Sequence, residues 1–482
     1  MGEASIGVEH ASMINDTLVD NLSISWRMAL FQVAALASTM FSSLVTDIGC
    51  VALTLWAMRG PLASIQVLAL FVAIRGMNPM LIHWGPVSTT LTWALPLIVS
   101  LRVFPLIRRS DFRIIGPLWI FCAVAILCSI AGSLALAVSI MKAASLGFIV
   151  AAVVVASLRL KYLEVNALGT WLRSLAFVVA TLSLVSFIRP DIAHYPDTNL
   201  LQGILDQPQA LGAFLAPFSA AFVANWLWKA ERSNPIGLVV MVVIVLCMVL
   251  TLSRTAAIAA LLGTAMALIG GRSSTGDAGS KVSTRVLLLA AFLIIAGLGA
   301  ELVGGGVSAA VSGFVLKRGE TEVSDAFLAS RGGGMISELQ HFLSSPIVGN
   351  GFGVYPDGQF PVPVVEFYGI PVSAPVEKGV LPSAVLEETG LLGFIAFSYL
   401  IYSVIKPLWH RVSPSVSALL FGCLFINFGE AILLSAGNIG LYTWLLIGWC
   451  FRVAMEHESA DGAPSEVPEL QRIQKPFLNL LN

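Results

Sequence analysis

Apolar stretches long enough to cross a lipid bilayer recur along almost the whole chain of 482 residues. A membrane-spanning helix needs about 20 consecutive, mostly apolar residues, so each stretch predicts a span. Charged residues make up only 11% of the chain, against roughly 25% in soluble proteins. The sequence therefore predicts an all-α fold, a polytopic transmembrane helix bundle of about 12–14 spans.

The first three predicted spans are short or interrupted, so the sequence is compatible with either 12 or 14 spans. The spans are expected near 27–43, 46–59, 63–80, 84–104, 114–134, 140–158, 171–189, 210–229, 234–252, 255–271, 285–304, 385–406, 414–434 and 439–453. Residues 1–25 lack the basic start and short apolar core of a cleavable signal peptide. We therefore expect membrane insertion to use the internal helices.

Connections rich in Lys and Arg alternate with connections that lack them. Cytoplasmic loops of membrane proteins retain positive charge, so this alternation predicts the orientation of the bundle. When the spans alternate, five basic clusters fall on one side: 102–113, 159–173, 229–232, 272–285 and 406–411. We expect this side to be the cytoplasm of a bacterium, with the chain in the inner membrane and both termini cytoplasmic.

This topology divides the chain into four parts. They are an N-terminal transmembrane bundle (1–304), a large periplasmic loop (305–384), C-terminal transmembrane helices (385–453) and a cytoplasmic tail (454–482). The loops 190–209 and 253–254 fall on the periplasmic side as well. A loop as long as 305–384 is rarely a passive connection, so we expect it to contain short helices and a functional surface.

Two arginines on the predicted periplasmic side are candidates for anion binding. Arg254 lies between two apolar helices, where it is either a helix cap that reaches the lipid headgroups or a fixed cation for a phosphate. Arg331 precedes a predicted amphipathic helix in the long loop. It is either an exposed loop residue or a second cation at a helix N-terminus, where anions are favoured.

Glycines and helix starts supply candidate substrate-binding positions. Gly349, Gly351 and Gly353 alternate with other residues, and such spacing permits either a tight turn or a close approach of the backbone to a phosphate. Gln209 follows Pro208 at the predicted start of a helix on the same side. A glycine-rich turn by itself is more often only a turn.

Carboxylates near the end of the long loop are candidate bases. Glu388 lies at the entry to a predicted span, where it could accept a proton from a hydroxyl or simply favour the helix start. Glu377 and Lys378 precede it and form either a surface ion pair or a base beside a substrate-binding cation. Asn427 and Glu430 lie within a predicted span, and we expect them to bond between helices.

Other classes of site have little support. The six cysteines lie in or beside apolar stretches and form no CxxC pair, so we expect buried apolar roles, no disulfide framework, no metal site and no cofactor. The net charge of −1 argues against nucleic acid as a partner.

Four segments, in order, resemble the bacterial O-antigen ligase and polysaccharide polymerase family of integral membrane glycosyltransferases. Their motifs are a Gly, Pro-Asn or Pro-Gln, Gly turn; a Ser-Arg helix start; a second arginine followed by Pro-Leu-Leu-Gly-x-Gly; and Leu-x-Glu-x-Gly-x-x-Gly. The matching segments are 202–212, 253–255, Arg331 with 346–353, and 386–393. Each motif is loose, but their order and shared side make the set fairly specific.

The resemblance implies an enzyme that moves a glycan from undecaprenyl pyrophosphate to a growing glycan or to lipid A-core, with chain-length regulators or export proteins as further partners. Arg254 and Arg331 would stabilise the leaving pyrophosphate without a metal. Glu377 or Glu388 would be the base, and substrate would be bound by Gln209, Lys378, Gly349, Gly351 and Gly353. Ligases of the family usually carry a histidine where this chain has Gly379, which favours the polymerase or exopolysaccharide branch.

Two other functions remain open. A transporter or flippase for a lipid-linked glycan or a small solute would show repeated halves and broken helices near the middle of the membrane, and no such symmetry is visible in the sequence. A scaffold for an assembly complex would have no need of outward arginines beside a glycine turn.

Overall fold

The computed structural model describes residues 24–196, 200–228, 235–270, 332–356, 365–367, 370–373, 378–409 and 411–461. Helices dominate this part of the chain, which confirms the predicted all-α class. The exception is an antiparallel hairpin of strands β1 (Val365–Phe367) and β2 (Ile370–Ser373), which the sequence did not predict. Arg331, Glu377 and the predicted span 285–304 lie outside the described residues.

Most of the helices begin within a few residues of the predicted spans. They are α2 (Trp26–Ser38), α3 (Ser43–Ala57), α4 (Pro61–Arg75), α5 (Pro86–Val103), α6 (Phe112–Gly132), α7 (Leu136–Leu158), α8 (Tyr162–Val185), α9 (Pro190–Ala193), α10 (Pro208–Trp228), α11 (Pro235–Leu250), α12 (Arg254–Gly270), α16 (Gly333–Ser344), α17 (Leu381–Ile405), α18 (Pro414–Phe425) and α19 (Asn438–Asp461). Short 3₁₀ turns are η1 (Phe104–Leu106), η2 (Arg109–Asp111), η3 (Ser186–Ile188) and η5 (Ile426–Phe428).

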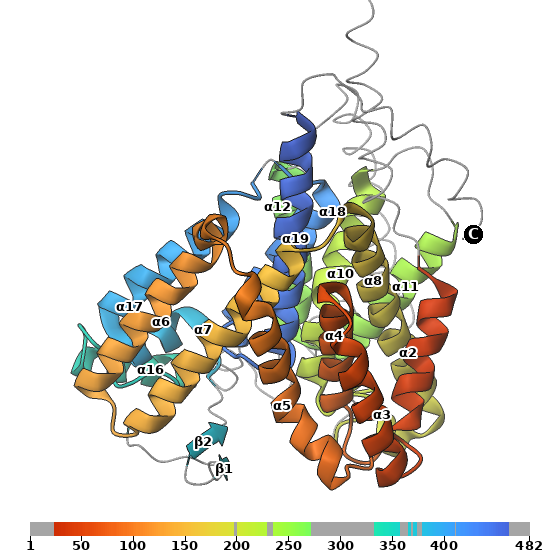
Figure 1. Cartoon of the computed structure of the whole chain (residues 1–482), viewed down its shortest axis with the longest axis horizontal. Coiled ribbons are helices and arrows are strands. Elements are labelled where there is room, and N and C mark those ends of the chain that lie inside the picture. Colours follow the sequence, from red (N-terminus) through yellow and green to blue (C-terminus); the bar gives the residue numbers. More distant parts are fainter. Residues whose placement is uncertain are drawn as a thin grey trace, which may run out of the picture.

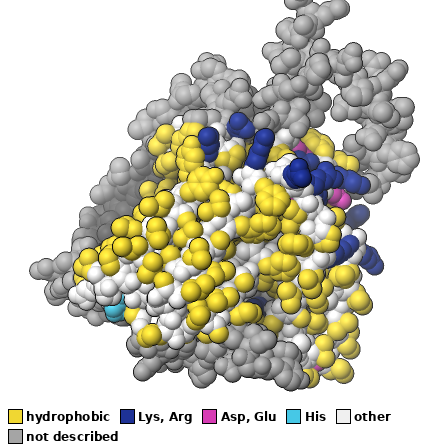
Figure 2. Space-filling view, turned by 60° about the vertical axis from the view of Figure 1, so that its left-hand side comes forward, with side chains coloured by type: hydrophobic (Ala, Val, Ile, Leu, Met, Phe, Trp, Pro, Cys, Tyr) yellow, Lys and Arg dark blue, Asp and Glu magenta, His cyan; other side chains and the backbone are white. Residues whose placement is uncertain are grey.

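The length and composition of these helices identify a membrane protein. Six of the described helical segments are long and apolar enough to cross a bilayer: 86–106, 109–132, 136–158, 162–188, 208–228 and 381–405. Large apolar side chains such as Leu127, Ile130 and Ile395 are exposed on the outside of the bundle, as expected for side chains that face lipid. Figure 2 shows one such face, largely hydrophobic, with Lys and Arg gathered toward its upper side.

The bundle has a central group of helices with others on either side (Figure 1). Helices α10, α12 and α18 pack together, and α19 contacts α4, α7, α8 and α18. On one side, α17 packs against α6 and α16, while α6 also contacts α7. The other side carries α2 to α5 with α8 and α11 (Figure 1).

Basic loops meet at one end of α6 and α7. Arg159 donates to the carbonyl of Leu106 and pairs with Asp111, which joins the α5–α6 and α7–α8 connections. Arg452, in the second half of α19, donates to the carbonyl of Leu160 at 2.8 Å. The turn between α6 and α7, which holds Ser133, lies at the opposite end of both helices. The predicted alternation of basic and non-basic ends therefore agrees with the packing of these helices.

The predicted basic stretch 159–173 is wrong in its second half. Glu164 accepts a hydrogen bond from the backbone N–H of Lys161 at 2.7 Å, so α8 begins at Tyr162, before the apolar run starts. Arg173 consequently lies about halfway along α8, where its side chain is buried and donates to Thr170. It belongs to the interior of the bundle and not to a cytoplasmic loop.

The helix in the predicted span 414–434 is also shorter than expected. Helix α18 ends at Phe425 and is followed by η5, after which the chain is irregular up to α19. Asn427 stabilises this exit, because its side chain donates to the carbonyl of Cys423 and accepts from the N–H of Leu433. Glu430 lies in the irregular link and not within a helix.

The opposite ends of α8 and its neighbours provide a test of the topology. Ser110 is exposed in the basic end and Asp191 is half-exposed just after α8. Cysteines introduced as Ser110→Cys and Asp191→Cys should react with an impermeant maleimide from opposite sides of the membrane. The six native cysteines are buried and should give little background. Labelling of both positions from the same side in intact cells would contradict this topology.

Candidate functional site

Helix α17 is broken at Gly390, and the break joins two of the motifs. Gly390 has a φ of 61° and a ψ of −163°, a conformation open to glycine. Four backbone hydrogen bonds then link α17 to the turn after α16: Asn350 to Glu387 and Gly351 to Glu388 at 2.9 Å each, Leu391 to Pro346 at 2.9 Å, and Leu392 to Ile347 at 3.2 Å. In an unbroken helix the α17 members of these bonds would pair with one another. The turn therefore replaces the hydrogen bonds that the break removes.

The alternating glycines let this turn pass between close neighbours. Gly349, Gly351 and Gly353 have φ values of 69°, 111° and 67°. Side chains there would collide with the protein itself: a Cβ atom would lie 2.5 Å from the backbone of Glu388, 2.5 Å from Ser133 and 2.3 Å from Lys142, respectively. The spacing thus has a packing reason, and a substrate-binding role for these glycines stays a prediction.

A substitution at the break should be costly to stability. In Gly390→Ala the new Cβ would lie 2.4 Å from the backbone of Ile347 and at a positive φ, so we expect a loss of about 1–3 kcal/mol. Gly116→Ala in α6 is the matched control, because no atom lies within 4 Å of its Cβ position. Thermal unfolding of the detergent-solubilised protein compares the two. Equal unfolding midpoints would show that the break is not required.

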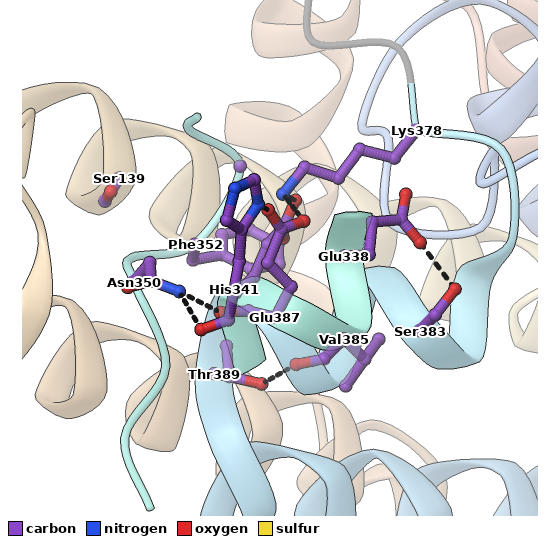
Figure 3. Close-up of polar contacts among 12 residues, drawn as sticks. Ser139, Glu338, His341, Asn350, Phe352, Lys378, Ser383, Val385, Glu387 and Thr389 are labelled. Atoms are coloured by element: carbon purple, nitrogen blue, oxygen red, sulfur yellow. Dashed lines mark hydrogen bonds and ion pairs between the residues drawn. The ribbon is translucent and has the colours of Figure 1, made fainter. Parts of the chain in front are cut away.

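The residues just before the break form a buried cluster of charges (Figure 3). The Nζ of Lys378 lies 2.6 Å from Oε2 of Glu387 and 3.3 Å from Oε1 of Glu388. All three side chains are less than a tenth exposed. Burial lowers the pKa of Lys378, but the two carboxylates raise it by more, so the net shift is upward. Lys378 is therefore a buried ammonium held by two carboxylates, and not half of a surface ion pair.

His341 extends the cluster toward the surface. This residue of α16 has its Nδ1 2.8 Å from Oε1 of Glu387, so the Glu387 carboxylate bridges His341 and Lys378. The His341 side chain is 42% exposed, whereas that of Glu387 is 3% exposed. Neither His341 nor Glu387 is among the site residues predicted from the sequence. The histidine carries no local motif, and only the fold shows that it contacts a glutamate 46 positions away.

Two further charges surround the same carboxylates. Lys142 of α7 donates to the carbonyl of Gly353 at 3.1 Å, and its charge interacts with Glu388 and Lys378. Glu338 of α16 is buried and accepts a hydrogen bond from Ser383. Burial raises the pKa of Glu338, and the charges of Glu387 and Glu388 raise it further, against the opposing effects of Ser383 and Lys378.

Helix α16 turns its charged side inward and its apolar side outward. Glu338 is buried against α17, whereas Ile336, Leu339 and Leu343 are exposed. A helix in water arranges these faces in the opposite way. The arrangement is typical of a helix whose outer face contacts lipid at a membrane boundary.

The raised pKa of Glu338 predicts a pH dependence of stability. A carboxyl whose pKa is higher in the folded state favours folding below its usual value of 4.5, and this contribution is lost as the pH rises through the folded pKa. Glu338→Gln removes the titration. The unfolding midpoint of the wild type, relative to that of the variant, should therefore fall as the pH rises above 4.5. Parallel curves would show that Glu338 does not titrate differently on folding.

Arg254 stands at the same end of the bundle as the charged cluster. It is the first residue of α12, and its neighbour Thr255 packs against Gly429, whose Cβ would lie 2.2 Å from the Thr255 hydroxyl. Two positions further on, the N–H of Ala431 donates to the carbonyl of Lys378 at 3.3 Å. The short segment 429–431 thus connects the start of α12 to Lys378.

The Pro208–Gly212 motif lies beside the start of α12. A Cβ atom on Gly212 would lie 2.9 Å from the side chains of Ser253 and Ala256, so α10 and α12 are in close contact there. Gln209 is exposed in the first turn of α10. The described parts of all four motif segments therefore lie at one end of the bundle, while Arg331 and Glu377 fall outside the described residues.

Metal ligands are not grouped within the described ranges, where no three His, Cys, Asp or Glu side chains are placed to hold a metal ion.

Neither a scan against protein-family models nor a search of curated proteins finds a match to this chain. The resemblance to O-antigen ligases and polysaccharide polymerases therefore rests on the sequence motifs alone.

Proposed function

We propose that this protein transfers a glycan from undecaprenyl pyrophosphate to a sugar acceptor at the periplasmic face of a bacterial inner membrane. The reaction would polymerise repeat units of O-antigen or exopolysaccharide, or ligate O-antigen to lipid A-core. The observation that supports it most is the docking of the glycine turn onto the broken helix α17. This docking gathers cations and carboxylates at the end of the bundle where α12 begins with Arg254.

The chemistry requires stabilisation of a leaving group and activation of an acceptor. Negative charge develops on the pyrophosphate as its bond to the sugar breaks, and fixed cations in a partly dry site stabilise this charge. Arg254 and Arg331 are our candidates for this role. Gln209, Lys378 and the glycines of the turn are candidates for substrate binding. Glu388 remains a candidate base, although its carboxylate is engaged by Lys378 at 3.3 Å, and Glu377 remains a second candidate.

The orientation is part of the proposal. The basic end, with Arg159 and the 102–113 connection, would face the cytoplasm together with both termini. The site would then face the periplasm, where the lipid-linked glycan is presented. Chain-length regulators or export proteins would be further partners at that face.

A transporter is the second candidate, because a broken helix is a common feature of transporter binding sites. The break in α17, however, follows its ninth residue in a helix that runs from Leu381 to Ile405, so it lies toward one end. The backbone groups that lose their helical partners at the break are hydrogen-bonded to the turn after α16. They are therefore not available to bind a transported solute. Enzymatic transfer accounts better for charges collected at one end.

Glycan fractionation tests the proposed function directly. A strain that lacks the gene should accumulate donor on the lipid carrier. Single repeat units on the carrier would indicate a polymerase, and long chains missing from lipid A-core would indicate a ligase. Copies with Arg254→Ala or Arg331→Ala should restore transfer roughly 10²- to 10³-fold less well than wild type.

Arg189→Ala is the matched control, because this arginine is exposed and pairs with Asp191 on the loop after α8. It should restore transfer fully. An unchanged glycan profile in the deletion strain would argue against any transfer role. Full restoration by both alanine copies would remove the two arginines from the mechanism.

A further inference from the structure

The exposure of the charged cluster is uneven. The side chains of Glu387, Glu388 and Lys378 are 3%, 8% and 5% exposed, and Glu338 is buried as well. The His341 side chain is 42% exposed. The exposed part of His341 is thus within reach of an acceptor sugar without rearrangement of the protein.

The contacts of Glu387 fix the chemical form of His341. Lys378 donates to one carboxylate oxygen of Glu387 at 2.6 Å, and a carboxylate in such an ion pair only accepts hydrogen bonds. The Nδ1 of His341, 2.8 Å from the other oxygen, must therefore carry the proton. In a neutral imidazole this leaves Nε2 with a free lone pair, the arrangement that a positioned carboxylate gives to a histidine base.

We infer that His341, in place of Glu388 or Glu377, is the catalytic base of the proposed glycan transfer and that Glu387 is its positioning residue. The inference rests on the proposed function. Nε2 takes the proton from an acceptor hydroxyl as the hydroxyl oxygen bonds to the anomeric carbon of the donor. The bond from that carbon to the pyrophosphate breaks, and its electron pair leaves with undecaprenyl pyrophosphate. The imidazolium then returns its proton to water.

The surrounding charges suit this role. Glu387 contacts the imidazole directly, and Lys378, Glu388, Glu338 and Lys142 complete the cluster around it. The negative carboxylate stabilises the imidazolium that forms when the proton is accepted. Glu387 itself is a poor base, because both of its oxygens are engaged and the side chain is almost fully buried.

A purely structural function for the same contact is the alternative. The His341–Glu387 bond could serve only to hold α16 against α17, where Glu338 and Ser383 also join the two helices. A structural bond would affect stability but not the dependence of the rate on pH. The pH profile therefore separates the two roles.

The test uses full-length protein in lipid nanodiscs with the lipid-linked glycan extracted from the deletion strain. The rate of glycan release from the carrier is measured from pH 5.5 to 9. The wild-type rate should fall toward the acid end of this range, since protonated imidazole cannot accept a proton. His341→Gln should lower the rate roughly 10²- to 10⁴-fold and abolish this fall, with an unchanged KM for the donor. Glu387→Gln should shift the fall to lower pH, because the imidazolium loses its stabilising charge.

Rescue by free imidazole distinguishes loss of the catalytic group from loss of folding. His341→Ala should recover activity when free imidazole is added, provided that its unfolding midpoint matches wild type. His194→Gln is the control. His194 lies outside the charged cluster, in the loop after α8, where its ring is hydrogen-bonded to the carbonyl of Pro190. A wild-type rate and pH profile in His341→Gln would overturn this inference alone. Wild-type protein that releases no glycan would overturn the proposed function and the inference with it.

Discussion

The exchange of backbone hydrogen bonds between α17 and the turn after α16 holds the site together. A break in a membrane helix leaves backbone groups that lipid cannot satisfy, and each such group costs several kcal/mol. Here the turn supplies the missing donors and acceptors, and its glycines let the two backbones approach closely. The break and the turn therefore depend on each other, since neither would be stable alone in an apolar setting.

The charged cluster follows from this arrangement. Just before the break, α17 places Glu387 and Glu388 beside Lys378. Helix α16 adds His341 and Glu338, which lie close to Glu387 and Lys378 in Figure 3. Buried charges are tolerated only where partners compensate for lost hydration, and removal of one partner leaves the other uncompensated. Opposite charges in close contact meet this condition. Such a network is also rigid, which suits the positioning of reacting groups.

The placement of the cluster agrees better with enzymatic transfer than with transport. The candidate residues gather at the end of the bundle opposite the basic loops, close to the starts of α10 and α12. Helix α16 adds an apolar outer face at the same end. A lipid-linked donor has an apolar tail and a charged head, and it would meet an apolar surface and a set of fixed charges in neighbouring positions. The proposed function and the role of His341 both use this proximity.

The sequence by itself determined the elements and their alternation. Apolar runs predicted α6 near 114–134 and α7 near 140–158, close to the observed Phe112–Gly132 and Leu136–Leu158, because lipid requires long apolar helices whatever the tertiary packing. The basic loops predicted which helix ends lie together. Glycine spacing marked the turn, since few other residues adopt positive φ. Arg173 was misplaced because the capping interaction of Glu164, and not hydropathy, sets the start of α8.

Only the tertiary structure decided what the motif residues touch. The sequence left Lys378 open between a surface ion pair with Glu377 and a substrate-binding cation, and the structure shows it buried against Glu387 and Glu388. His341 had no signal at all, because its partner comes from a different helix 46 residues away. Local propensity and hydropathy describe a chain segment and the solvent or lipid around it. Contacts between distant side chains depend on how helices cross and where a helix breaks. Here they depend on the break at Gly390 and on the turn at 345–353 that packs against it.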